Sequence, residues 1–330
     1  MVKHIAIQSY GSSISITGAR LFVSIKGEEG VEIPLNRLKS LKLSGRGAII
    51  SSNAISECAK RGIPIYICDW NGRYISQLSG SHEHAVVQLR KRQLEYVDRL
   101  SSRDLAKLIL YGKVKNQKAV LQYFAKYQRK KGVSVDWLES ALNSLDSIVK
   151  SILAFSGEIE WRSSLLGFEG SAASIYWNAL KNDIYFGDSF KGRVGRGAGD
   201  SINQALNLGY SILETYIWNA IHLAGLEPYA GVIHTDRPGK PALILDLMEE
   251  YRPWMVDRIV LSLKSHLLGT ERISEEARKL VISGVQKAFE SIHPYRGKKL
   301  HIEVILQRQV YRLCGVFYQK SSYKPILFKW

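Results

Sequence analysis

Three short stretches of the sequence carry side chains that could hold a cation. Glu169 is a lone carboxylate in an otherwise apolar, small-residue run from Leu166 to Ala173, where an uncompensated charge would be costly. His234 ends an extended run just before the next predicted helix. Asp246 and Glu249 are three residues apart, so a helix would put them on one face, where two acids favour a cation between them. Two or three carboxylates with one imidazole would bind a hard divalent ion, magnesium or manganese, and the imidazole favours manganese.

Pro253 follows the last of these acids and should disturb the helix beside it. Proline has no N–H to donate to the carbonyl of the residue four earlier, which is Glu249, so we expect the backbone to kink and open there.

Each of the three stretches also has an ordinary interpretation. A helical Glu usually pairs with a base, a lone His near a helix start usually caps the helix or packs in the core, and Asp-x-x-Glu is common on exposed helices. Only their combination favours a metal site. His82 and His84 are a rival pair in a polar stretch typical of a surface, and zinc is disfavoured because no cysteine accompanies the acids.

A basic segment lies between Arg90 and Lys131. It holds thirteen Lys or Arg and three acids, whereas the whole chain has 46 basic and 30 acidic residues and a net charge of +16. Apolar residues at helical spacing among these charges predict two amphipathic helices with a basic face, which suits a phosphate backbone. One alternative is a solvated Lys/Arg face. A membrane-surface helix is less favoured, because the helices lack the Trp/Phe-rich apolar face that inserts. We expect DNA contacts from Arg90, Lys91, Arg92, Lys113 and Lys115.

A glycine-rich loop, 192–199, precedes a helix that should begin at Asp200. It resembles a phosphate-binding loop, but no strand precedes it and its spacing is not that of a dinucleotide fold. Its two arginines, Arg193 and Arg196, could still contact DNA.

Several common motifs are absent from the sequence. It has no Gly-x-Ser-x-Gly motif of hydrolases, no Cys-x-x-Cys and no Walker loop, and no run of the ~18 apolar residues that a membrane span needs. Three scattered cysteines indicate a reducing compartment, so we expect a cytoplasmic protein with no membrane partner.

The spacing of hydrophobic residues divides the chain into two parts. Residues 1–78 contain short runs that alternate in period two and one stretch with helical spacing, 48–60, which predicts a small sandwich-like β domain with one helix. A polar Gly/Ser-rich linker at 79–86 follows, and the period then becomes 3.6. The expected fold class is α+β, with an all-α catalytic domain over 87–330.

The clearest predicted helix runs from Asp200 to Ala224, with Asp200 as its N-cap and Gly225 at its end. A β domain of about eighty residues has little core and exposes sheet edges, so it should pair with its copy in a homodimer. Further helices are expected around residues 88–111, 113–130, 135–155, 160–182, 241–263, 274–290 and 300–318.

Eight motifs occur in order along nearly the whole chain. They are Ile33-Pro-Leu35, Ile63-Pro-Ile65, Asp69-x-x-Gly72, Lys113-Val-Lys-Asn-Gln117, Leu166-Gly-Phe-Glu-Gly170, Asp200-Ser-Ile-Asn203 with Leu208-Gly-Tyr210, the stretch from His234 through Asp246-Leu-Met-Glu249-Glu-Tyr-Arg-Pro253, and Tyr323-Lys-Pro325 with Trp330. Together they resemble the family of CRISPR-associated integrases and endonucleases that insert new spacers, CRISPR-associated protein one.

The resemblance implies an N-terminal β domain that builds a homodimer, a helical domain with one divalent metal, and assembly with CRISPR-associated protein two. Position by position, the implied metal ligands are Glu169, His234 and Glu249, with Asp246 as a further acidic catalytic residue. The sequence departs from the family at loop 192–199, where an arginine- and proline-rich stretch is more usual.

The implied activity is insertion of double-stranded prespacer DNA into a CRISPR repeat by metal-dependent transesterification, in which a DNA 3′-hydroxyl attacks a phosphodiester. Attack by water would make the same site an endonuclease. Two other classes stay open: a DNA-binding scaffold with a degenerate metal site, and a branched-DNA repair nuclease outside CRISPR.

Overall fold

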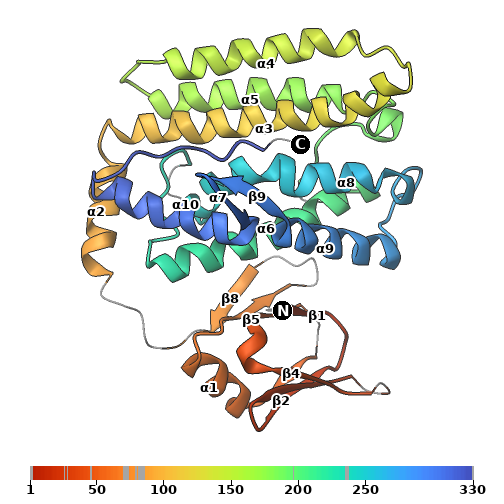
Figure 1. Ribbon diagram of the computed structural model, residues 1–330, viewed down its shortest axis with the longest axis vertical. Helices are drawn as coiled ribbons and strands as arrows, with labels where there is room; N and C mark the ends of the chain where they lie inside the picture. The colour runs from red at the N-terminus through yellow and green to blue at the C-terminus, as the bar shows by residue number, and fades with distance from the viewer. Residues whose placement is uncertain are drawn as a thin grey trace. The chain divides into compact units, whose positions relative to one another are not determined.

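The chain divides into two compact units, Met1–Ala85 and Val86–Trp330 (Figure 1). The structure is a computed structural model that describes residues 3–328, except 26, 28, 45–46, 70–73, 79, 81–85, 196 and 235–237. Most of the predicted linker at 79–86, with His82 and His84, lies outside the described residues, as does Trp330.

The described residues of the first unit form two four-stranded sheets that share one core. One sheet has the order β1-β5-β7-β8 and the other β4-β3-β2-β6. Period-two alternation turns Leu41 and Ile65 of the first sheet toward Ile14 and Leu21 of the second, with Cys58 of the helix beside them. The elements are β1 (Lys3–Ile7), β2 (Ser13–Thr17), β3 (Arg20–Ser24), β4 (Val31–Pro34), a 3₁₀ turn (Leu35–Arg37), β5 (Leu38–Leu43), β6 (Ile49–Ile50), α1 (Ser52–Lys60), β7 (Ile65–Cys68) and β8 (Tyr74–Leu78).

The predicted β region with one helix is confirmed, although the helix begins later than expected. Ile49 and Ile50 pair with β2 as a short parallel strand. The side chain of Ser51 then accepts the N–H of Ala54 at 3.2 Å, so α1 begins at Ser52.

Helices make up most of the second unit. In Figure 1, α3, α4 and α5 lie side by side, and each of them packs against the other two. Helix α7 contacts both α3 and α6. No helix among the described residues is long and apolar enough to cross a membrane. The elements are α2 (Val87–Val97), α3 (Ser102–Lys130), α4 (Trp137–Ala154), α5 (Trp161–Ala179), α6 (Ser201–Ala224), α7 (Ala242–Arg252), a π-helical turn (Pro253–Asp257), α8 (Arg258–Ser262), α9 (Glu275–Glu290), β9 (Ile292–Tyr295), β10 (Lys298–His301) and α10 (Ile302–Phe317), with 3₁₀ turns at Gly187–Ser189 and Lys264–His266.

Helix α6 confirms the sequence prediction at both ends. Oδ1 of Asp200 accepts the N–H of Asn203 at 2.8 Å, which caps the first turn. Gly225 ends the helix with a φ of 72°, a left-handed conformation that glycine adopts without steric cost.

The predicted helix break at Gly112 is wrong. Helix α3 runs without interruption from Ser102 to Lys130. Gly112 instead permits close packing, because a Cβ there would lie 2.7 Å from Cβ of Pro325 and 3.2 Å from Cγ of Glu250. The all-α prediction for this unit also needs correction, since β9 and β10 form an antiparallel hairpin before α10.

The C-terminal segment is fixed against the helix that carries the candidate acids. The hydroxyl of Tyr323 donates to Oε2 of Glu250 at 2.9 Å. Nδ2 of Asn116 donates to the carbonyl of Glu250 at 2.7 Å and to that of Ile326 at 3.0 Å. Burial raises the pKa of Glu250 to about 8, so this carboxyl is mainly protonated at neutral pH. Residues 323–326 are therefore bound to α7 through Glu250.

Candidate active site

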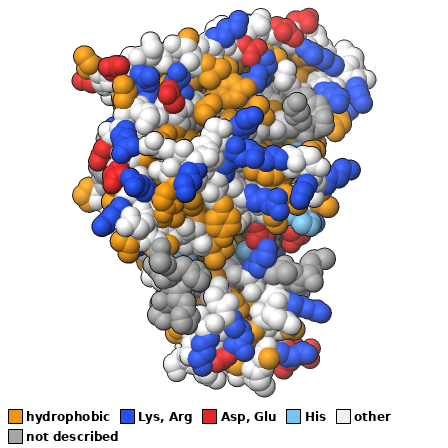
Figure 2. Space-filling view, turned by 60° about the vertical axis from the view of Figure 1, so that its left-hand side comes forward, with side chains coloured by type: hydrophobic (Ala, Val, Ile, Leu, Met, Phe, Trp, Pro, Cys, Tyr) orange, Lys and Arg blue, Asp and Glu red, His pale blue; other side chains and the backbone are white. Residues whose placement is uncertain are grey.

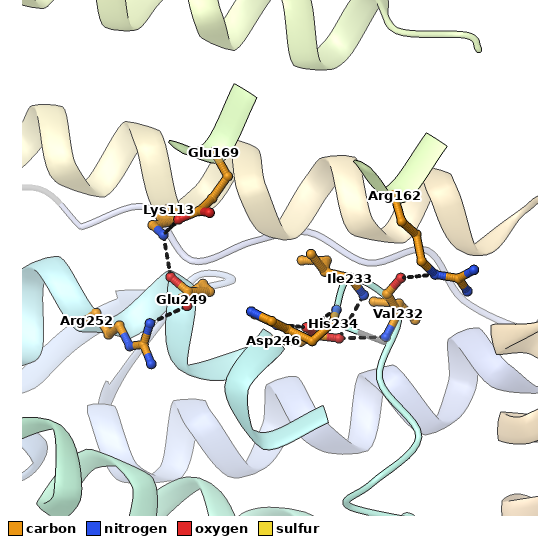
Figure 3. Close-up of polar contacts among 9 residues, drawn as sticks. All are labelled: Lys113, Arg162, Glu169, Val232, Ile233, His234, Asp246, Glu249 and Arg252. Atoms are coloured by element: carbon orange, nitrogen blue, oxygen red, sulfur yellow. Dashed lines mark hydrogen bonds and ion pairs between the residues drawn. The ribbon is translucent and has the colours of Figure 1, made fainter. Parts of the chain in front are cut away.

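Side chains from three helices and one loop converge in the second unit (Figure 3). Lys113 lies on α3, Glu169 on α5, and Asp246 and Glu249 on α7. His234 lies in the segment between α6 and α7 and is hydrogen-bonded to Asp246 of α7. Since α3 packs against both α5 and α7, segments far apart in the sequence are neighbours in the fold.

An ammonium group lies between two of the carboxylates. Nζ of Lys113 is 2.6 Å from Oε2 of Glu249 and forms a second ion pair with Oε1 of Glu169. The Lys113 side chain is only 9% exposed, so both pairs are shielded from solvent. The guanidinium of Arg252 pairs with Oε1 of Glu249. Each carboxylate oxygen of Glu249 thus faces a cation.

These charges set the protonation of the cluster. Burial by itself would raise the pKa of Glu249, but Arg252 and Lys113 lower it to about 2, with a smaller contribution from His234. Burial also acts to lower the pKa of Lys113, yet Glu249 and Glu169 together raise it above its usual value. Glu249 is therefore a carboxylate and Lys113 an ammonium at neutral pH. The stabilisation from their pairing is lost only as the pH falls below 4.5 toward about 2.

Asp246 holds the loop that carries His234. Its side chain is fully buried, and its Oδ2 accepts the backbone N–H groups of Val232 at 2.6 Å and Ile233 at 3.0 Å. Oδ1 accepts the backbone N–H of His234 at 3.1 Å and lies 2.7 Å from Nδ1 of the same residue. A carboxylate that accepts the Nδ1 proton leaves the Nε2 lone pair free. Both carboxylate oxygens of Asp246 are thus engaged in holding this loop, and its predicted catalytic role stays a prediction.

Two residues that sequence reasoning missed keep this loop in place. A Cβ on Gly231 would lie 2.6 Å from Cβ of Ala242 and 2.8 Å from Oδ2 of Asp246, so only glycine permits this approach. From the other side, Nε of Arg162 donates to the carbonyl of Val232 at 3.1 Å. No sequence signal identifies Arg162, because its partners are backbone carbonyls far along the chain.

Gly231→Ala is expected to destabilise the protein by about 1–3 kcal/mol, because the added methyl group must displace either Ala242 or the Asp246 carboxylate. Thermal unfolding measures this loss. The matched control is Gly167→Ala on α5, where a Cβ meets no atom within 4 Å. Equal stability of the two variants would show that the loop does not depend on close approach at residue 231.

The predicted ligands fit a hard divalent ion in donor type. Glu169 and Glu249 supply carboxylate oxygens, and His234 supplies an imidazole whose other nitrogen is held by a carboxylate. The buried Oε2 of Glu249 also makes no hydrogen bond of normal geometry. As the side chains lie, no three acidic, His or Cys residues of the described chain form one coordination group, and the Lys113 ammonium lies between two of the predicted ligands. Their role as ligands stays a prediction.

The predicted opening of the backbone at Pro253 takes the form of a π-helical turn from Pro253 to Asp257. The turn places the Asp257 carboxylate so that it accepts hydrogen bonds from the hydroxyls of Tyr176, at 3.0 Å, and Tyr210. The guanidinium of Arg252 stacks over the Tyr210 ring, 5.2 Å from its centroid. Arg252 could have been found from the sequence, because a base three residues after Glu249 shares its helical face.

The predicted DNA contacts fall into different environments. Lys113 is buried between Glu169 and Glu249 and is not part of an exposed basic face, so as the side chains lie its ammonium faces carboxylates, and its contact with DNA stays a prediction. Nε of Arg90 donates to the carbonyl of Gly225 at 3.2 Å, which gives this half-buried side chain a structural role.

The remaining candidates are more accessible. Lys91 and Arg92 are exposed on α2, and Lys115 is about one-third exposed on α3. Arg193 donates to Asn207 at 2.6 Å, and its guanidinium stacks 5.1 Å from the Tyr210 centroid, so the glycine-rich loop is fixed beside Arg252. Figure 2 shows Lys and Arg side chains spread over one face of the helical unit. Arg196 lies outside the described residues, and DNA contact by the others stays a prediction.

Comparison with known proteins identifies the family. The family model for CRISPR associated protein Cas1 matches residues 5–285. A protein of Francisella tularensis subsp. novicida (strain U112), named CRISPR-associated endonuclease Cas1 1, is 40% identical over 331 residues, which cover 100% of each chain. The chain belongs to the Cas1 family. The resemblance predicted from the ordered motifs is therefore confirmed.

Solved structures share the Cas1 fold with this chain. A casposase bound to integration product has a TM-score of 0.81 at 22% identity, covering 99% of this chain and 95% of that one. A chain of a Cas6-RT-Cas1--Cas2 complex has a TM-score of 0.77 at 24% identity, and the match covers 99% of this chain but 36% of that longer one. These likenesses show the fold, and they agree with the predicted β region followed by a mainly helical region.

Proposed function

We propose that the chain is a divalent-metal-dependent DNA endonuclease and integrase that inserts spacer DNA into a CRISPR array by transesterification. One observation carries the proposal: carboxylates from α5 and α7 meet beside an imidazole whose Nδ1 is fixed by Asp246. Glu169, Glu249 and Nε2 of His234 would hold the ion. A bound magnesium or manganese ion would polarise a phosphodiester oxygen and stabilise the charge that develops on it during attack.

The chain's own side chains would orient the DNA around this site. Arg193 and Arg252 both stack on Tyr210, and Arg252 also pairs with Glu249, so two guanidinium groups lie at one tyrosine next to the site. A guanidinium can donate two parallel hydrogen bonds to the oxygens of one phosphate. Lys91 and Arg92 are exposed and would neutralise phosphates further along the duplex. Asp246 would hold His234 in one tautomer throughout.

The proposed partners are double-stranded DNA, both prespacer and CRISPR repeat, and CRISPR-associated protein two. Support comes from two solved structures of the same fold, a Cas6-RT-Cas1--Cas2 complex and a casposase bound to integration product. We also propose a homodimer through the first unit, whose outer strands β1, β8, β4 and β6 leave sheet edges. The three scattered cysteines, Cys58, Cys68 and Cys314, support the proposed location in the reducing cytoplasm.

A strand-joining assay tests this function. A short duplex with free 3′-hydroxyl ends is incubated with a plasmid that carries the CRISPR repeat, with the protein and its small partner, with and without manganese. We expect joined product that requires both the metal and the 3′-hydroxyl. Cleavage of branched DNA without joining would favour a repair nuclease, and DNA binding that is indifferent to manganese would favour a scaffold.

A further inference from the structure

Lys113 is a buried charge that the proposed chemistry does not use. Its ammonium contacts Glu169 from α5 and Glu249 from α7, so it connects two of the three predicted ligands. Its position is built into the packing of α3, because the neighbouring Gly112 lets this helix lie close to Glu250 and Pro325. A buried lysine at this place needs a reason, since removing its charge from water is costly.

The ammonium faces the same oxygens that a metal ion would need. Oε2 of Glu249 is buried and lies 2.6 Å from Nζ, so the ammonium already neutralises this oxygen. Oε1 of Glu249 is already paired with Arg252. A divalent ion bound to Glu169 and Glu249 would therefore have to take the place of Nζ, and two cations would otherwise repel each other at this distance.

We propose that Lys113 is a built-in counter-ion that holds Glu169 and Glu249 together in the metal-free protein and leaves them when a divalent ion binds. This inference rests on the proposed function, because it assumes that these carboxylates are ligands. A monovalent ion carries the same charge as the ammonium, so replacing the ammonium gains no electrostatic attraction to the carboxylates. A divalent ion carries twice that charge and does gain attraction. The lysine thus favours divalent over monovalent ions, and it weakens the apparent affinity for the divalent ion by the strength of the contacts that must be broken.

The test is a manganese titration of the Lys113→Met protein by calorimetry, together with thermal unfolding of the metal-free protein. Methionine keeps much of the length of lysine and removes the charge. We expect manganese to bind about tenfold or more tightly than in wild type. The metal-free variant should unfold at a lower temperature than wild type, and added manganese should raise its unfolding temperature by more than that of wild type.

Lys115→Met is the matched control on the same helix. It removes one positive charge from a side chain that is about one-third exposed and 3.9 Å from Asp146, so manganese affinity should stay at the wild-type value. If Lys113→Met does not fold, Lys113→Gln replaces it with the same expectation, because glutamine keeps a donor toward the carboxylates without the charge.

Manganese binding by the Lys113 variants that equals or falls below wild type would overturn the inference. Failure of the proposed function gives a different result, in which wild type binds no manganese or His234→Ala binds it as tightly as wild type. The two failures are therefore distinguishable in one set of titrations.

Discussion

Replacing His234 by alanine is expected to abolish manganese-dependent cleavage and joining of DNA, with a loss in rate of about a thousand-fold or more. The substitution removes the one nitrogen donor among the predicted ligands. The loop itself should persist, because Asp246 still accepts the backbone N–H groups of Val232, Ile233 and residue 234. The measurement is the initial rate of strand joining in manganese at saturating DNA.

DNA affinity separates this chemical effect from a binding effect. His234→Ala should bind DNA within a few-fold of wild type, because phosphate neutralisation depends on other side chains. The complementary variant carries Lys91→Glu and Arg92→Glu, at two exposed positions of α2. Its DNA affinity should fall, and the salt dependence of binding should flatten by about one unit of slope per lost phosphate contact. Full joining activity in His234→Ala would show that His234 is not a required ligand and would contradict the proposed metal site.

Asp246→Asn is expected to cost about 2–4 kcal/mol of unfolding free energy and to weaken manganese binding by about 10–100-fold. The carboxylate accepts three backbone N–H groups and faces Nδ1 of His234, whereas an asparagine amide would turn an NH₂ group toward some of these donors. Buried donors would then lack acceptors, and the imidazole would lose its fixed tautomer. Thermal unfolding and a manganese titration measure the two effects.

Asp104→Asn is the matched control, because this acid is 64% exposed and should tolerate the same change with little effect on either quantity. The size of the effect on metal binding also distinguishes two roles for Asp246. A variant that keeps its stability but binds no manganese would identify Asp246 as a direct ligand and contradict its role in positioning His234.

Local signals in the sequence predicted those parts of the fold that depend on neighbouring residues. Both ends of α6 could be predicted, because Asp200 caps its own helix and Gly225 adopts the left-handed conformation that ends it. Gly112 misled the prediction because its role is set by Pro325 and Glu250, which are far away in the sequence. A glycine that ends a helix and one that admits a neighbour look alike in a single sequence.

In the candidate site, too, contacts between residues far apart in the sequence could not be predicted. The residue types Glu169, His234 and Glu249 indicated a hard-metal donor set, and the structure gathers them around α7. The sequence could not divide roles between Asp246 and Glu249, because their partners come from the preceding loop in one case and from α3 in the other. The burial of Lys113 could not be predicted for the same reason, since composition counts its charge but does not show the buried acids that pair with it.

The most direct test of the proposed metal site is a crystal structure of the protein grown or soaked in manganese, with anomalous diffraction used to locate the ion. We predict one manganese ion per chain within coordination distance of Glu169, Glu249 and Nε2 of His234. Asp246 should remain hydrogen-bonded to Nδ1 and absent from the coordination shell, and Nζ of Lys113 should have moved off the carboxylates. Anomalous density at other side chains, or no ordered ion beside Glu249 at saturating manganese, would contradict the account.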